Sequence, residues 1–279
     1  MGFSTALFLF AFLPLSAILY LIADRFFNTK VKNILLLVLS YIFYALSSWD
    51  TLGLFLVLTV ITYIFGMLIY YAKNADKSPV GAKCWLFIAC LAAALYLLAY
   101  KYIPALSQHL SGLFKQEITF ANLIVPIGVS FVIFEAVSYI VDIYRGDAAP
   151  GSFIDAAIFL SLFSKIVSGP IVLWKDFAPQ LAKRKTDSGD IAEGINRIII
   201  GLAKKVIIAD TLGMQIKFIT VDMAGMALDW QTSWLKALLY FFQLYYDFSG
   251  YSDIAIGISR VFGFKFKENF NYPYLSTSI

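Results

Sequence analysis

The chain has 279 residues, of which 60% are hydrophobic and 14% are charged, with a net charge of +4. Soluble domains carry about 25% charged residues, so this composition excludes a soluble globule or a disordered chain and predicts an integral membrane protein. The small, scattered positive excess excludes a nucleic-acid surface. Two cysteines and one histidine exclude a disulfide framework and a multi-histidine metal centre, so we expect no metal site.

Five apolar runs are predicted to cross the bilayer, whose hydrocarbon core takes about 20 helical residues. They cover residues 3–22, 31–46, 52–71, 84–103 and 123–144. Basic residues follow the first, third and fifth runs, so the positive-inside rule predicts that the N-terminus faces outward. The only histidine, His109, falls in the predicted outer loop between the fourth and fifth runs, where we expect a solvated side chain with no catalytic role.

The sixth run, residues 153–172, breaks this alternation because basic residues flank both of its ends. We therefore predict a re-entrant segment, since irregular backbone at membrane depth is tolerated only inside protein or beside a water-filled cavity. Ser161, Lys165 and Ser168 would form a helical stripe ended by Gly169 and Pro170. Lys165 would either neutralise an anionic substrate group or a buried carboxylate, or extend to the cytoplasmic interface.

Two further helices complete the predicted all-α, polytopic fold, which we expect to be a single membrane domain over residues 1–279. The first covers residues 191–219, and its Lys204 and Lys205 suit a cytoplasmic interfacial face. The second covers residues 234–262 and is polar in its middle.

Ionisable residues inside membrane segments are costly, so each is a candidate for function. In the fifth run, Glu135, Ser138 and Asp142 share a helical face, with Arg145 placed to pair with Asp142. They form either a functional site or a polar seam between helices. The last helix carries a second set, which indicates either a cavity wall or packing glycines with structural hydrogen bonds. The candidate cavity-lining residues are Gln243, Tyr246, Asp247, Ser249, Gly250, Asp253, Lys165 and Glu135. These patterns leave enzyme and transporter equally open.

Several motifs in order along the chain resemble the membrane-bound O-acyltransferase family, in its bacterial branch of alginate O-acetyltransferases. The matching stretches are residues 125–131, 138–146, 168–171 with 176–180, 201–205 with 209–211, and 246–253 with 268–274. The resemblance covers nearly the whole chain. It implies tilted transmembrane helices and re-entrant segments around a central funnel.

The resemblance also implies an activity, O-acetylation of an exported or cell-surface polysaccharide at the bacterial inner membrane. The acyl donor would be acetyl-CoA or an acylated carrier, with no bound cofactor, and the candidate protein partner would be a periplasmic or extracellular acetyltransferase. In the family, the Asn-Tyr-Pro-Tyr loop leads into a segment with a key histidine, which would fall after Ile279. The chain is therefore expected to be an N-terminal portion that is inactive alone, and His109 does not match the catalytic histidines. The alternatives are an ion-coupled transporter and a non-catalytic scaffold of a polysaccharide-modifying complex.

Overall fold

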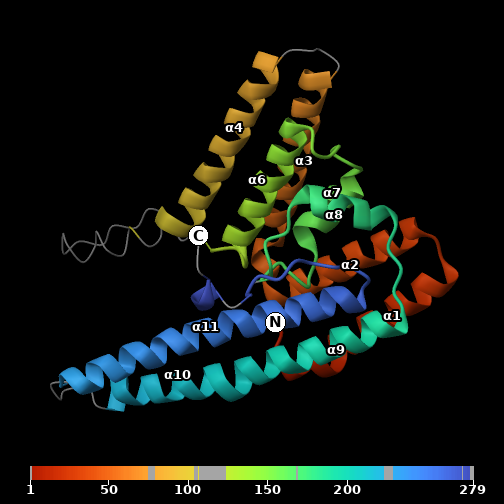
Figure 1. Cartoon of the computed structure of the whole chain (residues 1–279). Helices are drawn as coiled ribbons and strands as arrows, with labels where there is room; N and C mark the ends of the chain where they lie inside the picture. Colours follow the sequence, from red (N-terminus) through yellow and green to blue (C-terminus); the bar gives the residue numbers. More distant parts are fainter. Residues whose placement is uncertain are drawn as a thin grey trace. The chain divides into compact units, whose positions relative to one another are not determined.

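The computed structural model describes residues 2–74, 79–103, 106, 124–167, 169–222, 229–271 and 273–276 (Figure 1). Every regular element within these ranges is a helix, which confirms the all-α prediction. The chain divides into two compact units, each described below by itself. Unit 1 holds the described residues of 19–167 and 171–184, and unit 2 holds those of 2–18, 168–170 and 185–279. The single membrane domain and the central funnel stay predictions.

Among the residues described, four helical stretches are long and apolar enough to cross a membrane, and they overlap the first four predicted runs. They are Phe8–Phe26, Thr29–Ser47, Trp49–Asn74 and Pro79–Tyr102. The fifth predicted run forms α6 (Val129–Arg145), which begins later than residue 123 because Pro126 and Gly128 precede it. Gly128 has a φ of 68°, a conformation that favours glycine. The 17 residues of α6 span about 26 Å, slightly less than the bilayer core.

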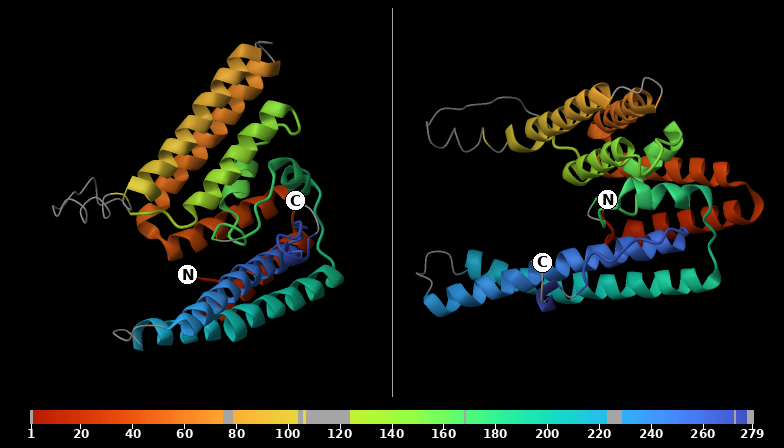
Figure 2. Two further views of the ribbon diagram at one scale, coloured as in Figure 1. Left: turned by 60° about the vertical axis from the view of Figure 1, so that its left-hand side comes forward. Right: turned by 45° about the horizontal axis from the view of Figure 1, so that its top comes forward.

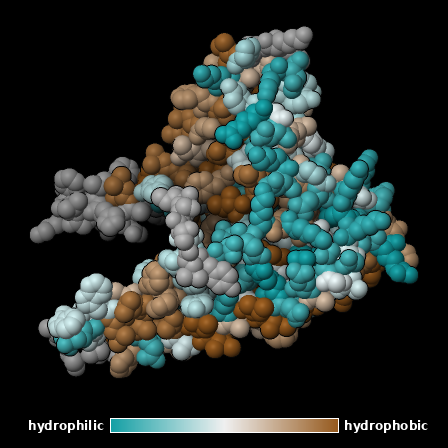
Figure 3. Space-filling view, in the orientation of Figure 1, coloured by the Kyte–Doolittle hydropathy of each residue, from teal (hydrophilic) through white to brown (hydrophobic). Residues whose placement is uncertain are grey.

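Unit 1 packs its helices around a core rich in aromatic side chains. Its elements are the second part of α1 (Leu13–Phe26), α2 (Thr29–Ser47), η2 (Trp49–Thr51), α3 (Leu52–Asn74), α4 (Pro79–Leu97), η3 (Leu98–Tyr102), α6, α7 (Phe153–Ser161) and α8 (Trp174–Ala182). Figures 1 and 2 show α3 and α4 as an antiparallel pair, with α6 beside them. Hydrophobic side chains gather on the exposed surface of α4 (Figure 3), as expected of a helix that faces lipid.

The predicted re-entrant segment is a short, broken helix. α7 has nine residues, about 14 Å, which is too short to cross a bilayer. It ends at Ser161, before the predicted break at Gly169 and Pro170, and the next helix of the chain starts at Trp174. The predicted helical stripe is therefore wrong, because Lys165 lies in the turn beyond α7; Ser168 lies outside the described residues.

Two contacts explain this early end. The Phe163 N–H donates to the Ser40 hydroxyl of α2 (3.2 Å), and the Lys165 ammonium donates to the carbonyl of Phe159 in the last turn of α7. In a continued helix, the Phe163 N–H would donate to the Phe159 carbonyl. Here each of these two groups has a side-chain partner instead.

Unit 2 is built on a long antiparallel helical hairpin. Its first arm is continuously helical through α9 (Ser188–Leu202), η4 (Ala203–Ala209), α10 (Asp210–Lys217) and η5 (Phe218–Asp222). Its second arm is α11 (Trp230–Val261), which lies along α9 and α10 in both figures (Figures 1 and 2). The unit also holds η1 (Phe8–Phe12), the first part of α1, and η6 (Pro273–Leu275). Residues 262–271, which we call the C-terminal strap, leave α11 without forming a helix.

Candidate functional site

Four glycines bring the two arms of the hairpin into backbone contact. Gly194 faces Gly257, and Gly201 faces Gly250. A Cβ atom on Gly201 would lie 2.7 Å from the Gly250 carbonyl oxygen, and one on Gly257 would lie 2.6 Å from the Gly194 carbonyl oxygen. The contacts recur after about two helical turns on each arm. Small residues at this spacing allow two helices to approach closely, so these glycines fix the register of the hairpin.

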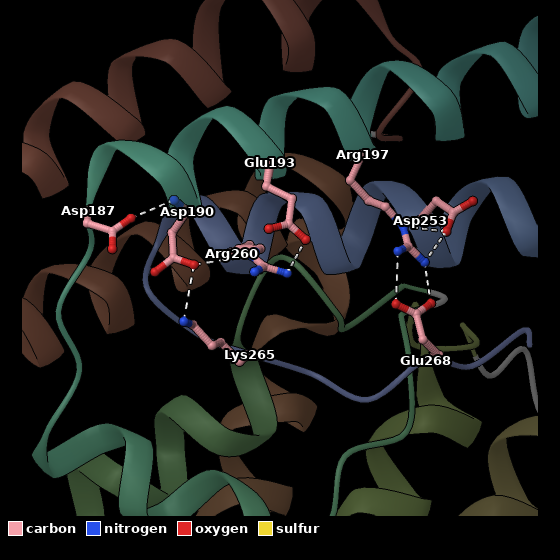
Figure 4. Close-up of polar contacts among 8 residues, drawn as sticks. All are labelled: Asp187, Asp190, Glu193, Arg197, Asp253, Arg260, Lys265 and Glu268. Carbon is pink, nitrogen blue, oxygen red and sulfur yellow. Dashed lines mark hydrogen bonds and ion pairs between the residues drawn. The ribbon is translucent and has the colours of Figure 1, made fainter.

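Each of these glycines is followed three residues later by a charged side chain on the same face. They are Arg197, Lys204, Asp253 and Arg260. Asp253 is a buried residue, only 5% exposed, and it pairs with both Arg197 and Lys204. Figure 4 shows its contact with Arg197. Arg197 donates from Nε to Asp253 Oδ1 at 2.8 Å, and Lys204 Nζ donates to Oδ2 at 2.5 Å. A buried carboxylate with two cationic partners is an arrangement that offsets the cost of its desolvation.

The C-terminal strap joins this network through two ion pairs. The Arg197 guanidinium also binds Glu268, donating from Nη1 to Oε1 at 2.8 Å and from Nη2 to Oε2 (Figure 4). Nearer the start of α9, Asp190 accepts from Arg260 Nε and pairs with Lys265 Nζ, both at 3.2 Å. The strap is therefore attached to α9 at two places.

A cavity of about 340 Å³ lies where Arg197, Asp253 and Glu268 meet. Its lining combines charged, hydroxyl, amide and aromatic groups: Arg197, Ile200, Lys204, Tyr245, Ser249, Asp253, Glu268, Phe270 and Asn271. Its volume falls within the range of small-molecule sites, about 300–1,000 Å³. This combination can bind a polar substrate and hold charge in a defined position.

Lys204 and Lys205 lie in the π-helical turn η4, and both contact partners of opposite charge in unit 2. Lys204 donates to Asp253 and to the Ser249 hydroxyl (3.1 Å), while Lys205 pairs with Asp247 at 2.8 Å and Asp210 at 2.7 Å. The cytoplasmic interfacial position expected of these lysines stays a prediction. π-helical turns inside helices are frequent at functional sites.

The structure distributes the predicted cavity residues among several surroundings. Ser249 and Asp253 line the cavity, whereas Gly250 packs on Gly201 and Asp247 pairs with Lys205. The Gln243 amide approaches Gly213 of α10, and the Tyr246 ring contacts Tyr245. Glu135 and Lys165 belong to unit 1 and pair with each other. His109 lies outside the described residues.

Sequence reasoning missed Arg197 and Glu268 as site residues. Arg197 and Lys204 each follow a glycine by three residues, and this repeat could have placed Arg197 on the same helical face as Lys204. Glu268 belongs to one of the family-like motifs, but its position in the strap offers no helical periodicity that would place it beside Arg197.

The Glu135–Lys165 pair lies in the core of unit 1. The carboxylate and ammonium are 2.5 Å apart, and their side chains are 3% and 0% exposed. Lys165 Nζ also lies over the rings of Phe159 and Phe177, at 4.5 and 5.7 Å from their centroids. The alternative that Lys165 extends to the interface is therefore wrong, because this side chain neutralises a buried carboxylate.

Two other polar residues of α6, Ser138 and Asp142, form a polar seam between helices. This was one of the two roles that the sequence predicted for them. The Ser138 hydroxyl accepts from the Trp174 N–H (3.3 Å) and the Asp142 carboxylate accepts from the Lys175 N–H (3.0 Å). They thus cap the first turn of α8, whose N–H groups have no partner within the helix. The expected Asp142–Arg145 pair is replaced by this contact, and Arg145 is exposed.

These features define the class of the protein: an all-α, multi-pass membrane protein with a charged cavity. Over the full chain, it is 38% identical to the probable alginate O-acetylase AlgI of Azotobacter vinelandii, covering 55% of that protein, and 39% identical to that of Pseudomonas aeruginosa, covering 53%. It is 31% identical over 99% of the chain to the peptidoglycan O-acetyltransferase of Helicobacter pylori, covering 57% of it. No family model matches the chain.

These relatives, similar along the whole chain, are enzymes of the membrane-bound O-acyltransferase type named alginate O-acetylase, which confirms the resemblance. The chain spans about half the length of these relatives and corresponds to their N-terminal part.

Proposed function

We propose that the whole protein is a membrane O-acyltransferase that O-acetylates a polysaccharide. The observation that carries the proposal is the similarity of the entire chain to enzymes named as O-acetylases of alginate and peptidoglycan. The cavity of unit 2 supports it, because hydroxyl, amide and ionic groups around an aromatic lining suit a carbohydrate acceptor. The transporter and scaffold alternatives have no comparable support.

The donor would be acetyl-CoA or an acylated carrier presented from the cytoplasm, and the acceptor would lead outward, with or without a periplasmic partner. The catalytic histidine would belong to the part of the protein that follows the Asn-Tyr-Pro-Tyr loop. There it would act as a general base on the acceptor hydroxyl or orient the acyl thioester. In this scheme the residues of unit 2 bind and orient substrate, and none of them is assigned the proton transfer.

The experiment uses the full-length protein in proteoliposomes with labelled acetyl-CoA and a polysaccharide on the opposite side. We expect donor-dependent appearance of label on the polysaccharide. Label that stays on the donor side, together with uptake of an unmodified solute in the absence of donor, would contradict acyl transfer and favour the transporter.

We further propose that the protein lies in the bacterial inner membrane with its N-terminus outside. Single cysteines replacing Thr5 and Asn28, in a full-length protein whose other cysteines are removed, would flank the first apolar helix. A membrane-impermeant maleimide added to the outer side should label the cysteine at position 5 and spare the one at position 28. Labelling of position 28 alone would reverse the orientation.

A further inference from the structure

Another cavity lies in unit 1, between the start of α4 and the end of α6. Its volume is about 640 Å³, and its lining is apolar except for one lysine: Pro79, Val80, Lys83, Cys84, Phe87, Ile88 and Tyr144. The lining residues from α4 repeat every four positions, so they share one face of that helix. They form a groove that extends about 14 Å along α4, roughly the depth of one leaflet of the bilayer core.

The groove lies on a part of α4 that is exposed to lipid. Val80 and Phe87 are 72% and 68% exposed, within a helical stretch that is long and apolar enough to cross a membrane. Apolar side chains at this exposure are unfavourable in water and favourable in hydrocarbon. An acyl chain is therefore the ligand whose chemistry matches the lining.

Positive charge gathers at one end of the groove. Lys83 lies one turn from the start of α4, and its side chain leans toward the N-terminus of the helix and the membrane surface. The first turn of α4 has no acidic residue, so the partial positive charge of the helix terminus adds to that of the lysine. Among the described residues, the lining holds no carboxylate to balance Lys83. The groove thus matches a ligand with an anionic group at one end of an apolar chain.

The wall of the groove on α6 is held in place and is also basic. Lys73, at the end of α3, donates from Nζ to the Tyr144 carbonyl at 2.7 Å. Arg145 follows Tyr144 along α6 and is exposed. Asp147, the next acidic residue of the chain, pairs with Lys175 at 3.5 Å. An anion at this end of the groove would therefore meet basic residues on both α4 and α6.

We propose that this groove binds one anionic phospholipid, with its phosphate at Lys83 and an acyl chain along Val80, Cys84 and Phe87. In the orientation proposed above, the start of α4 and the end of α6 face the cytoplasm, so the lipid belongs to the cytoplasmic leaflet. Basic pockets between membrane helices on that side bind anionic headgroups. The bound lipid fills the cavity between α4 and α6. The inference uses the proposed orientation only to name the leaflet and does not depend on acyl transfer.

The test uses Cys84, an exposed thiol in the groove, as a local reporter of occupancy. Full-length protein in detergent, with its other cysteines replaced, is titrated with dioleoyl-phosphatidylglycerol or with dioleoyl-phosphatidylcholine, which has the same chains but no net charge. The measurement is the lipid concentration that halves the rate at which N-ethylmaleimide modifies Cys84. We expect this concentration to be at least about fivefold lower for phosphatidylglycerol, the effect of about one basic residue on an anionic lipid.

Three variants separate the groove from general surface charge. Lys83→Gln should bring the two half-protecting concentrations together, and Lys83→Arg should keep them apart. Lys30→Gln is the matched control, because Lys30 is an exposed lysine at the start of α2, outside the groove lining and on the same proposed side of the membrane. It should leave the preference unchanged. Comparing the two lipids within each variant cancels any change in the intrinsic reactivity of the thiol.

Three results would overturn the proposal: equal protection of the wild-type thiol by the two lipids, the same loss of preference in Lys30→Gln as in Lys83→Gln, or equal protection by water-soluble glycerol phosphate. If the cysteine replacements impair folding, native mass spectrometry of the otherwise unmodified protein answers the same question. Wild-type protein should retain one more phosphatidylglycerol than Lys83→Gln does, and equal retention would contradict the site.

Discussion

Replacing Gly201 by alanine is expected to destabilise the protein by about 1–3 kcal/mol, the usual cost of overpacking a close contact. The added methyl group would meet the Gly250 carbonyl oxygen at 2.7 Å and the Ile254 nitrogen at 2.8 Å. Both are backbone atoms, so the contact is relieved only by moving α9 away from α11. The expected readout is a lower thermal unfolding midpoint of the full-length protein in detergent.

The matched control is Gly53→Ala in α3, where nothing lies within 4 Å of the added methyl group. Alanine is favoured over glycine in a helix by about 1 kcal/mol, so this change should be neutral or stabilising. A loss of stability at Gly201 together with no loss at Gly53 would support the close contact between α9 and α11. A stabilising effect at Gly201 would show that the two arms of the hairpin are not in backbone contact there.

Breaking the buried ion pair of unit 1 is expected to have the largest effect on stability. Glu135→Gln would leave the Lys165 ammonium without its counter-charge, in surroundings where its side chain has no exposure. Removing one partner of a buried pair costs about 3–5 kcal/mol. We expect a marked loss of folded full-length protein, measured by its thermal unfolding midpoint and by the yield of monodisperse material.

The double substitution Glu135→Leu with Lys165→Met should recover most of that loss, because it removes both charges and keeps the volume apolar. The turn after α7 would still lose the contact from Lys165 to the Phe159 carbonyl, so recovery should be incomplete. A double variant as unstable as Glu135→Gln would contradict charge burial as the cause and point to the side-chain shapes instead.

Hydropathy was sufficient to predict the first four membrane helices, because length and apolar content alone decide whether a helix can cross a bilayer. The bounds of α6 and α7 required more information. α6 starts after a glycine with positive φ, and α7 ends where Ser40 of a distant helix binds the Phe163 N–H. The hydrogen bond between Ser40 and Phe163 joins residues that are far apart in the sequence. A local sequence pattern therefore could not predict it.

The candidate site was only partly predictable for the same reason. The polar middle of α11 identified Asp253 and Ser249, because carboxyl and hydroxyl groups are unusual in an apolar helix. Arg197 and Glu268 are separated by 71 residues and come from a helix and an irregular strap. Their meeting depends on how the strap folds back over the hairpin, which helical periodicity does not encode.

The most direct test of the functional assignment is the acetyl-transfer rate of the full-length protein carrying Asp253→Asn, with Glu193→Gln as the control from the same hairpin. Asp253 holds Arg197 and Lys204 at the cavity, and misplacing binding groups by about 1 Å can reduce a rate roughly a hundredfold. We predict a rate at least about tenfold below wild type for Asp253→Asn and a near-normal rate for Glu193→Gln. A wild-type rate in well-folded Asp253→Asn protein would show that this cavity has no part in acyl transfer.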